Sequence, residues 1–303
     1  MQEQNSKFTI KQPIRTVHLD NLKIGSDTSF HFLTENENVS KSLYALELNI
    51  FNPHNSPQVV QNAFLDVLND PVNLNDPVKT IQKAQTTSCD ILGLKFNIDE
   101  NINSIKPAKE LLKELLPHIT KPLMIRGINN SEIDSILLPE LISVLDRQAI
   151  IAFAEEKSYK NIVPSVVKGE HILVIRTPID INLAKEMNIL TTEMGLSADK
   201  ILIDTDMGGL GYGLEYGYSI MERIKLAGFE GDKMLNMPII AFAGEETLKT
   251  KEAKSEEFSE SWGELNQRAT MLEITAGSAI SAAGANIVVL NLPKSVETLK
   301  GVQ

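Results

Sequence analysis

The feature that most constrains the fold is a regular alternation of short apolar runs with segments of helical periodicity, starting near residue 43. Each run is rich in Ile, Leu and Val, which is typical of strands buried on both faces of a parallel sheet. Eight such runs occur, at residues 44–51, 91–96, 122–125, 149–153, 171–175, 201–203, 238–242 and 286–290. The pattern predicts an α/β fold, a (β/α)8 TIM barrel, over residues 43–303.

The segments between the runs carry signals for helix boundaries. Asp180 is expected to cap a helix that stops at Gly195. Pro107 is expected to open another helix and Ser131 to cap a third, which Pro139 should kink or split. Residues 51–78 contain four prolines and predict a long connection with one short helix. Residues 245–261 predict a charged, solvated insertion, and residues 293–300 leave room for only a short eighth helix.

The leader before the barrel has a different pattern. Residues 8–34 alternate apolar and polar positions around two turn signals, Asp20-Asn21 and Gly25-Ser26-Asp27. This pattern predicts a β-hairpin. We expect residues 1–42 to form an N-terminal hairpin extension that covers the bottom of the barrel.

Composition excludes several classes of function. The formal charge of −11 and the lack of a Lys/Arg cluster argue against binding to nucleic acid. The single cysteine, Cys89, cannot form an internal disulfide, and it cannot hold an iron–sulfur cluster without thiolates from another chain. The five histidines are widely spaced, which disfavours a metal site. Neither a signal-like segment nor a long apolar span is present, so we expect a cytoplasmic protein that does not enter a membrane.

A glycine-rich loop follows the sixth run. Asp204 ends that run, Gly208, Gly209, Gly211 and Gly213 follow, and a helical pattern begins after them. Glycine allows positive φ and close approach of the backbone to a ligand, so this loop is suited to a flat contact. The carboxylates and the missing Gly-Lys-[Ser/Thr] ending disfavour a phosphate cradle. A turn that packs only against neighbouring loops remains an alternative.

Functional side chains of such a barrel lie at the carboxyl ends of its strands. The polar residues that follow the apolar runs are Asn49, Asn52, Lys95, Asn97, Arg126, Asn129, Glu155, Glu156, Arg176, Asp180, Asp204, Asp206, Glu245 and Asn291. Arg176 and Asp204 lie on adjacent predicted strands, and a structural ion pair between them is favoured over a catalytic role. The spacing reveals no nucleophile–base pair, although Lys95 stands near a strand end.

Several of these stretches carry a resemblance. Residues 176–190, residues 204–223 with their Gly-Gly-Leu-Gly-Tyr-Gly-Leu-Glu-Tyr motif, and residues 231–238 closely resemble one family. It is the small (delta) subunit of the corrinoid iron–sulfur protein, part of the carbon monoxide dehydrogenase/acetyl-CoA synthase (acetyl-CoA decarbonylase/synthase) system. A weaker likeness extends from residue 44 to the end and includes residues 155–159 and Trp262-Gly263.

The resemblance implies a barrel subunit that forms a heterodimer with a large (gamma) subunit, which bears the iron–sulfur cluster and a cobamide shared between the two. The heterodimer would carry a methyl group from a methyl-tetrahydropterin, through a methyltransferase, to acetyl-CoA synthase, and both enzymes would be transient partners. The barrel would not be catalytic alone and would shield the corrin. The residues expected near the cobamide or bracing its loops are Gly208, Gly209, Gly211, Tyr212, Asn97, Glu155, Arg176, Asp180 and Asp204.

Two alternatives stay open. A pterin-dependent methyltransferase is also a barrel that binds its pterin with Asn and Asp at strand ends, and Asn97, Asn129 and Asp204 could imitate that arrangement. The second alternative is a scaffold subunit that never touches the cobamide.

Overall fold

A computed structural model describes residues 10–30, 41–66 and 74–302, and every structural statement below concerns these residues. The predicted barrel is confirmed. Its eight parallel strands follow the order β8-β7-β6-β5-β4-β3-β10-β9. The strands are β3 (Leu43–Phe51), β4 (Ile91–Phe96), β5 (Leu123–Arg126), β6 (Ala149–Ala154), β7 (Ile172–Arg176), β8 (Ile201–Asp204), β9 (Ile240–Ala241) and β10 (Ile287–Leu290).

The barrel is nearly closed, with its seam between β8 and β9. One bridge joins Ile203 to Ile239, and the Ile203 amide donates to the Pro238 carbonyl at 2.9 Å. β9 is shorter than the predicted strand at 238–242 because Pro238 has no N–H to donate and Phe242 already serves as the N-cap residue of the next helix.

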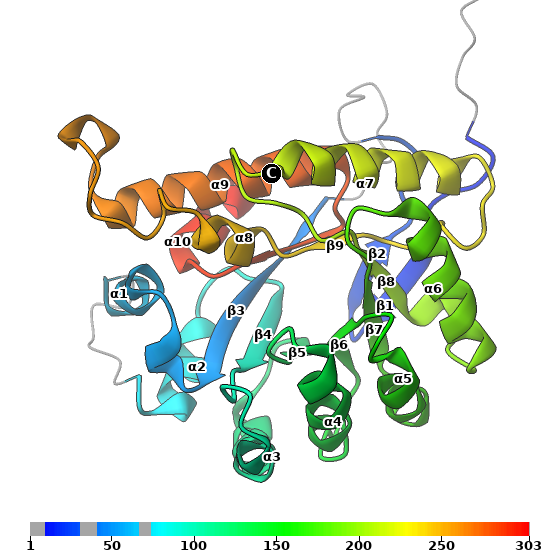
Figure 1. Ribbon diagram of the computed structural model, residues 1–303, viewed down its shortest axis with the longest axis horizontal. Helices are drawn as coiled ribbons and strands as arrows, with labels where there is room; N and C mark the ends of the chain where they lie inside the picture. Colours follow the sequence, from blue (N-terminus) through cyan, green and yellow to red (C-terminus); the bar gives the residue numbers. More distant parts are fainter. Residues whose placement is uncertain (1–9, 31–40, 67–73, 303) are drawn as a thin grey trace, which may run out of the picture.

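Helices surround the ring of strands (Figure 1). They are α1 (Gln58–Asp66), α2 (Pro77–Ala84), α3 (Ile105–Leu115), α4 (Ser131–Ile142), α5 (Tyr159–Lys168), α6 (Ile181–Glu193), α7 (Leu214–Phe229), α8 (Ala243–Lys249), α9 (Leu265–Ala283) and α10 (Pro293–Gly301). α7 and α9 pack side by side across one flank of the barrel.

The predicted helix signals are confirmed only in part. Asp180 caps α6 and accepts from the Asn182 and Leu183 amides at 2.8 and 3.1 Å, as predicted. Asn130, not Ser131, caps α4, because its side chain accepts from the first helical amides. Pro139 lies inside α4 without splitting it, since the helix ends only three residues later.

Three further predictions about helices had different outcomes. α3 begins before Pro107, which lies in the first turn, where a missing N–H is tolerated. Residues 51–78 contain one complete short α-helix, α1, as predicted, and α2 begins at the end of this stretch, at Pro77; residues 67–73 lie outside the described part. The prediction of a solvated insertion at residues 245–261 is wrong for residues 245–249, which belong to α8 and bury Thr247 and Leu248, whereas residues 254–261 lie mostly at the surface, as predicted.

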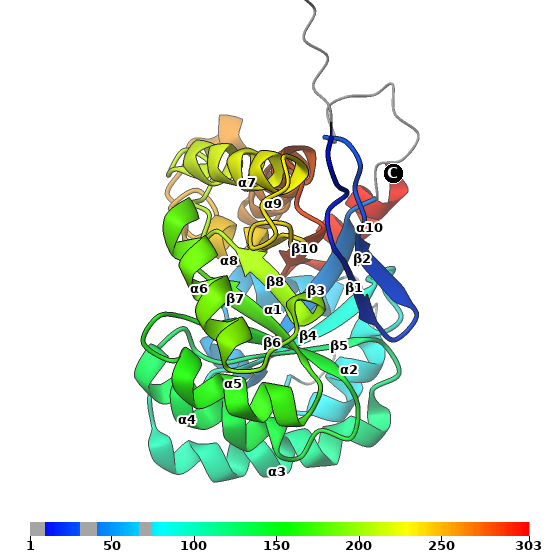
Figure 2. The same cartoon turned by 90° about the vertical axis from the view of Figure 1, so that its right-hand side faces the viewer.

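The predicted N-terminal hairpin is present, as β1 (Thr16–Leu19) and β2 (Leu22–Gly25). Val17, Leu19 and Ile24 are buried in one apolar cluster with inward-facing residues such as Ala45 and Ile287, which lie near the start of their strands. Figure 2 shows the hairpin, in dark blue, along the side of the barrel away from α8. Residues 8, 9 and 31–34 of the predicted hairpin lie outside the described residues.

A buried ion pair ties the segment after the hairpin to the barrel. The Lys225 ammonium lies 2.9 Å from the Asp27 carboxylate and donates to the Gly284 carbonyl at 3.0 Å. The Asn286 amide also donates to Asp27, at 2.7 Å. Both charged side chains are at most 1% exposed, so neither charge can be compensated by water.

In the described parts of the chain, no helix combines the length and the apolar character that crossing a bilayer requires.

Candidate functional site

Strand alternation aims a row of polar side chains into the mouth of the barrel. Successive strand residues point to opposite faces, so Ala45 and Glu47 on β3 both point inward. The same rule brings inward the last or near-last residues of the other strands. The residues concerned are Lys95 on β4, Arg126 on β5, Arg176 on β7, Asp204 on β8 and Asn291 after β10.

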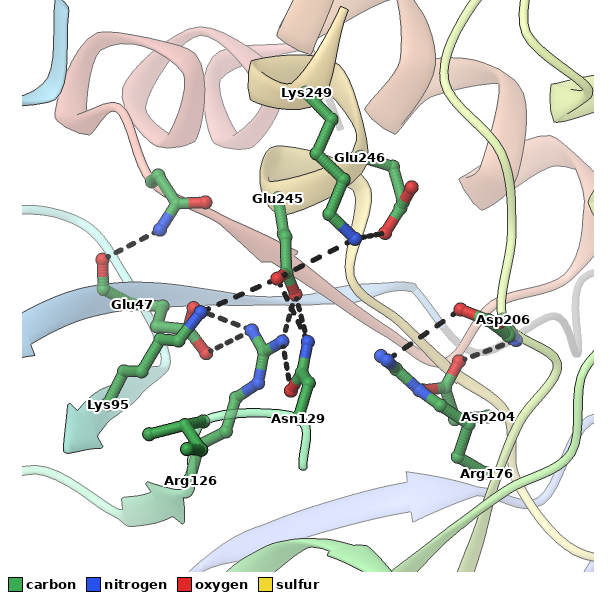
Figure 3. Close-up of polar contacts among 12 residues, drawn as sticks. Glu47, Lys95, Arg126, Asn129, Arg176, Asp204, Asp206, Glu245, Glu246 and Lys249 are labelled. Carbon is green, nitrogen blue, oxygen red and sulfur yellow. Dashed lines mark hydrogen bonds and ion pairs between the residues drawn. The ribbon is translucent and has the colours of Figure 1, made fainter. Parts of the chain in front are cut away.

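Arg126 is the centre of the first of two ionic clusters (Figure 3). One of its terminal nitrogens donates to both oxygens of Glu47 at 2.8 and 3.0 Å, and the other donates to Glu245 and to Asn129. Lys95 and Lys249 approach the same Glu245 oxygen at 3.4 and 3.7 Å. Glu245 belongs to α8, so its carboxylate connects this helix to the residues at the mouth of the barrel.

Arg176 and Asp204 form the second cluster. The Arg176 Nε donates to Asp204 at 2.6 Å, and both side chains are buried. Asp206 lies 3.7 Å from the same guanidinium, and its amide donates to Asp204 at 3.0 Å. The predicted structural pairing of Arg176 with Asp204 is therefore present, and it holds the first residues of the glycine loop.

Two phenylalanines fill the space between the clusters. Phe153 and Phe242 meet edge to face with ring centroids 5.4 Å apart. The Arg176 guanidinium lies 3.4 Å from the centroid of Phe153, and that of Arg126 lies 4.6 Å from the centroid of Phe242. Such contacts stabilise desolvated cations. The centre of the mouth is thus filled by paired charges and aromatic rings, although the buried Nε of Arg126 has no hydrogen-bond partner in the described structure.

The ionisation of these groups follows from burial and pairing. Burial opposes the charge on Arg126, but Glu245 and Glu47 outweigh it and raise the Arg126 pKa. Burial also acts on Glu245, yet Arg126, Lys95 and Lys249 hold its pKa well below the usual value. For Asp204, burial outweighs Arg176 and raises the pKa. Arg126 and Glu245 are therefore firmly charged.

Three glycines of the loop, Gly208, Gly209 and Gly211, differ in what surrounds them. A Cβ on Gly208 would lie 2.5 Å from the Tyr212 carbonyl oxygen, and one on Gly209 would lie 2.7 Å from Thr250 and 2.8 Å from the Glu246 carbonyl oxygen. Both glycines therefore serve close packing, of the loop on itself and on α8. Gly211 has φ +80° and faces open space. Tyr212 is 57% exposed beside it.

The remaining predicted site residues lie in neighbouring loops, where they make local contacts. The Asn97 carbonyl accepts from Asn52 at 3.0 Å, and Glu155 accepts from the Ser131 hydroxyl. Asp180 is occupied in capping α6. The structure thus brings Arg176 and Asp204 together beneath the glycine loop, whereas the described contacts of Asn97, Glu155 and Asp180 hold other loops.

Glu47 and Lys249 were missed by the sequence reasoning. Glu47 is the one charged residue of its strand and lies on the same inward face as Ala45 and Asn49. A charge at an inward position of a predicted strand is the signal that could have identified it. Lys249 carries no such signal, because the composition of residues 245–261 predicts a solvated insertion rather than a helix at the mouth.

A cleft of about 260 Å³ opens beside the first cluster, between α1, α8 and the ends of β3, β4 and β10. Its walls include Glu47, Asn49, Lys95, Glu245 and Asn291. The glycine loop packs against the other side of α8, through Gly209. The mouth therefore presents two separate surfaces, a polar cleft and an exposed loop. Among the described residues, no group of three or more His, Cys, Asp or Glu side chains is arranged to hold a metal ion.

Glu273 on α9 positions one wall of the cleft. This fully buried carboxylate accepts from the backbone amides of Asn291 and Leu292 at 2.7 and 3.2 Å. Burial raises its pKa from 4.5 to about 7, although these hydrogen bonds act in the opposite direction.

We expect Glu273 to make stability fall as pH rises from about 4.5 to 7, because the folded chain holds the proton more tightly than the unfolded chain. The full effect is about 3 kcal/mol. Glu273→Gln should remove this dependence, so the variant should gain stability relative to the parent between pH 5 and pH 8. Urea unfolding at both pH values measures it, with Glu264→Gln on the exposed start of the same helix as the control. Equal pH dependence of parent and Glu273→Gln would contradict the assignment.

The fold and the mouth define a (β/α)8 barrel whose interior is closed by its own ion pairs, with a cleft and a glycine loop at the rim. Residues 39–276 match the family described as "CdhD: CO dehydrogenase/acetyl-CoA synthase delta subunit". Because this match covers most of the chain, the protein belongs to that family, as its motifs indicated.

Individual relatives agree. The chain is 28% identical over 248 residues to the acetyl-CoA decarbonylase/synthase complex subunit delta of Methanocaldococcus jannaschii, covering 81% of this chain and 60% of that protein. It is 30% identical over 207 residues to subunit delta 1 of Methanosarcina thermophila, covering 65% and 47%. The chain thus spans less than two thirds of the length of these curated relatives.

Among solved structures, similar barrels are dihydropteroate synthases. The Vibrio fischeri enzyme aligns with a TM-score of 0.61 at 10% identity, covering 95% of this chain and 96% of that one. The Coxiella burnetii enzyme in complex with pteroic acid aligns with a TM-score of 0.58 at 12% identity, covering 95% and 97%. At such low identity these likenesses establish the fold alone.

Proposed function

We propose that this chain is the small subunit of a corrinoid iron–sulfur protein and acts without catalytic chemistry of its own. In this role it pairs with a large (gamma) subunit that bears the iron–sulfur cluster, and it covers a cobamide shared by the two. The heterodimer carries a methyl group from a methyl-tetrahydropterin, through a methyltransferase, to acetyl-CoA synthase in the reductive acetyl-CoA pathway of the cytoplasm. The observation that carries this proposal is the family match over residues 39–276.

The rim around the glycine loop fits a broad macrocycle with an amide periphery. Tyr212, Tyr216 and Ile179 are 57%, 62% and 43% exposed, and Gly211 leaves open space at the tip of the loop. The half-exposed Asp206 carboxylate offers an acceptor for amide N–H groups. Exposed apolar side chains that gather at one rim are typical of a binding surface. When bound, the cobamide would supply a cobalt centre that accepts and passes on the methyl group.

We assign distinct tasks to this chain's residues. Gly211 and Tyr212 would contact the corrin, while Gly208 and Gly209 shape the loop that presents them. Arg176 and Asp204 brace the base of that loop through their buried ion pair. Glu155 and Asp180 hold neighbouring loops. Asn97, whose carbonyl accepts from Asn52, lines the polar cleft, so we assign it to bracing the loop after β4. Covering the corrin in this way would exclude water and oxidants from the reactive centre.

The packed mouth disfavours the alternative of a pterin-dependent methyltransferase. Asn129 donates to Glu245 at 3.0 Å, and Asp204 is buried against Arg176, so neither faces an open cavity in the barrel centre. Phe153 and Phe242 occupy the space between them. A pterin inserted there would have to displace this packing.

Anaerobic co-expression with the candidate large subunit tests the proposal. Size-exclusion chromatography, with a corrinoid absorption spectrum recorded across the peak, should show co-elution and a spectrum different from that of the large subunit alone. A chain that elutes alone and binds methyl-tetrahydropterin would overturn the subunit assignment.

Gly211→Trp should slow methyl transfer by about tenfold or more without preventing heterodimer formation, because the bulky side chain would displace the corrin from the loop. Gly209 is unsuitable for this test, since any side chain there collides with α8. The matched control is Gly263→Trp, because Gly263 also has positive φ, +74°, and faces open space. Normal transfer by an intact Gly211→Trp heterodimer would favour the scaffold alternative.

A further inference from the structure

The cleft beside Lys95 has a cation with unused donors. The Lys95 ammonium offers three N–H donors, yet among the described residues its one polar contact is with Glu245, at 3.4 Å. Glu245 is shared with Arg126 and Lys249, so Lys95 has only part of one carboxylate. Its side chain is 21% exposed and lines the cleft. An anion in the cleft would accept hydrogen bonds from the unused N–H donors of Lys95.

Asn49 has an acceptor that lacks a hydrogen-bond donor. Its amide nitrogen donates to the Asn52 carbonyl at 3.0 Å, but its side-chain oxygen is buried without a hydrogen-bond partner in the described structure. A buried acceptor of this kind is costly unless a donor reaches it. Asn49 lines the same cleft as Lys95, so a single ligand with an acceptor and a donor could satisfy both once the buried Asn49 amide turns its oxygen towards the cleft.

The rest of the lining favours a negative charge. Lys254 and Lys249 also line the cleft, although Lys249 is paired with Glu246 at 2.6 Å. The two carboxylates of the lining, Glu47 and Glu245, are both engaged by Arg126. Val60 and Leu248 add apolar walls for a short carbon chain. A volume of about 260 Å³ suits a small molecule, just below the common range of ligand pockets.

We propose that this cleft binds a small carboxylate that also carries a hydroxyl or N–H donor, with Lys95 holding the carboxylate and Asn49 accepting from the donor. The site is separated from the glycine loop by α8 and does not depend on the proposed role in methyl transfer. The ligand class is that of small hydroxy or amino acids. An acidic side chain of another protein offers the same carboxylate chemistry.

Isothermal titration of the full chain with three matched probes tests this proposal. Malate has two carboxylates and a hydroxyl, succinate lacks the hydroxyl, and succinamide lacks the charge. We expect malate to bind most tightly, succinate more weakly by about fivefold or more, and succinamide not measurably. The blocked peptide acetyl-Gly-Asp-Gly-amide distinguishes the two sources: binding tighter than that of malate would assign the carboxylate to a protein chain.

Variants connect the binding to the named residues. Lys95→Met should weaken malate binding by about tenfold or more, because a charge-assisted hydrogen bond is lost. Asn49→Ala should erase the preference for malate over succinate. Lys109→Met, which breaks a pair with Glu140 on α3 and α4, is the control and should bind like the parent.

Several results would overturn the proposal. They are malate binding by Lys95→Met at the parent's affinity, equal binding of succinamide and malate, or no saturation by malate or the peptide up to about 10 mM. The probe comparison uses the unaltered chain, so it remains decisive even if a variant folds poorly.

Discussion

Replacing Arg126 by methionine is expected to destabilise the folded protein by about 3–5 kcal/mol, because the change leaves two buried carboxylates without their cation. Arg126 is fully buried and serves both Glu47 and Glu245, whose side chains are 2% and 14% exposed. Methionine keeps much of the side-chain volume, so the loss would report charge rather than a cavity. Urea unfolding near pH 7 measures it, with the exposed Arg223→Met as the control.

The pH dependence of this loss separates charge from packing. The paired Glu245 has a lowered pKa in the folded chain, so its stabilising effect is present above its unfolded value of about 4.5 and disappears as pH falls through the folded value. In Arg126→Met that effect is absent, and burial is left to raise the Glu245 pKa, so the folded variant should take up a proton as pH falls from 7 to 4 and recover part of the loss. The difference between parent and variant should therefore shrink in acid, and adding Glu47→Gln should recover part of the loss at pH 7. A loss of the same size at pH 4 and pH 7 would show that packing dominates.

The barrel was predictable because its signal is repeated. Each strand is a short Ile, Leu and Val run, and the repeated strand–helix alternation leaves few other architectures. The places where prediction failed are those where tertiary contacts outweigh local sequence. Residues 245–261 look solvated by composition, yet the pairing of Glu245 with Arg126 and the burial of Leu248 bring α8 onto the mouth.

The candidate site was predictable where partners lie on neighbouring strands. Arg176 and Asp204 pair across adjacent β7 and β8, so strand order alone brings them together. The cluster of Glu47, Arg126 and Glu245 joins β3, β5 and α8, and its members meet only once the barrel has curved. Local pattern carries no signal for such contacts across the mouth.

The glycine loop shows a further limit. Four glycines in six positions indicate a special backbone, but the sequence does not say what each glycine faces. In the structure, Gly208 packs on the loop itself and Gly209 on α8, whereas Gly211 faces open space. The close packing of Gly208 and Gly209 therefore does not exclude a ligand at Gly211, which stays a prediction.

Asp27→Ala is the second substitution with a large expected effect, about 3–5 kcal/mol, because it leaves the Lys225 cation buried without a carboxylate. Asp27 lies two residues after the end of β2, so its contacts with Lys225 and Asn286 tie the hairpin to the barrel. Beyond the global loss, amide hydrogen exchange should accelerate in β1 and β2 more than in β4 and β5. Asp20→Ala, in the exposed turn of the hairpin, is the control.

The pH dependence of the stability of Asp27→Ala tests whether the unpaired Lys225 cation causes the loss. Burial already lowers the Lys225 pKa in the folded chain, although Asp27 opposes this effect. Without Asp27 the pKa should fall further, so the folded variant would release its proton before the unfolded chain does. Stability of Asp27→Ala relative to the parent should therefore recover as pH rises towards about 10, the usual range of lysine. Adding Lys225→Met should also restore much of the loss at pH 7. If neither high pH nor the second substitution restores stability, Asp27 acts through its other contacts and the ion pair is not what holds the hairpin.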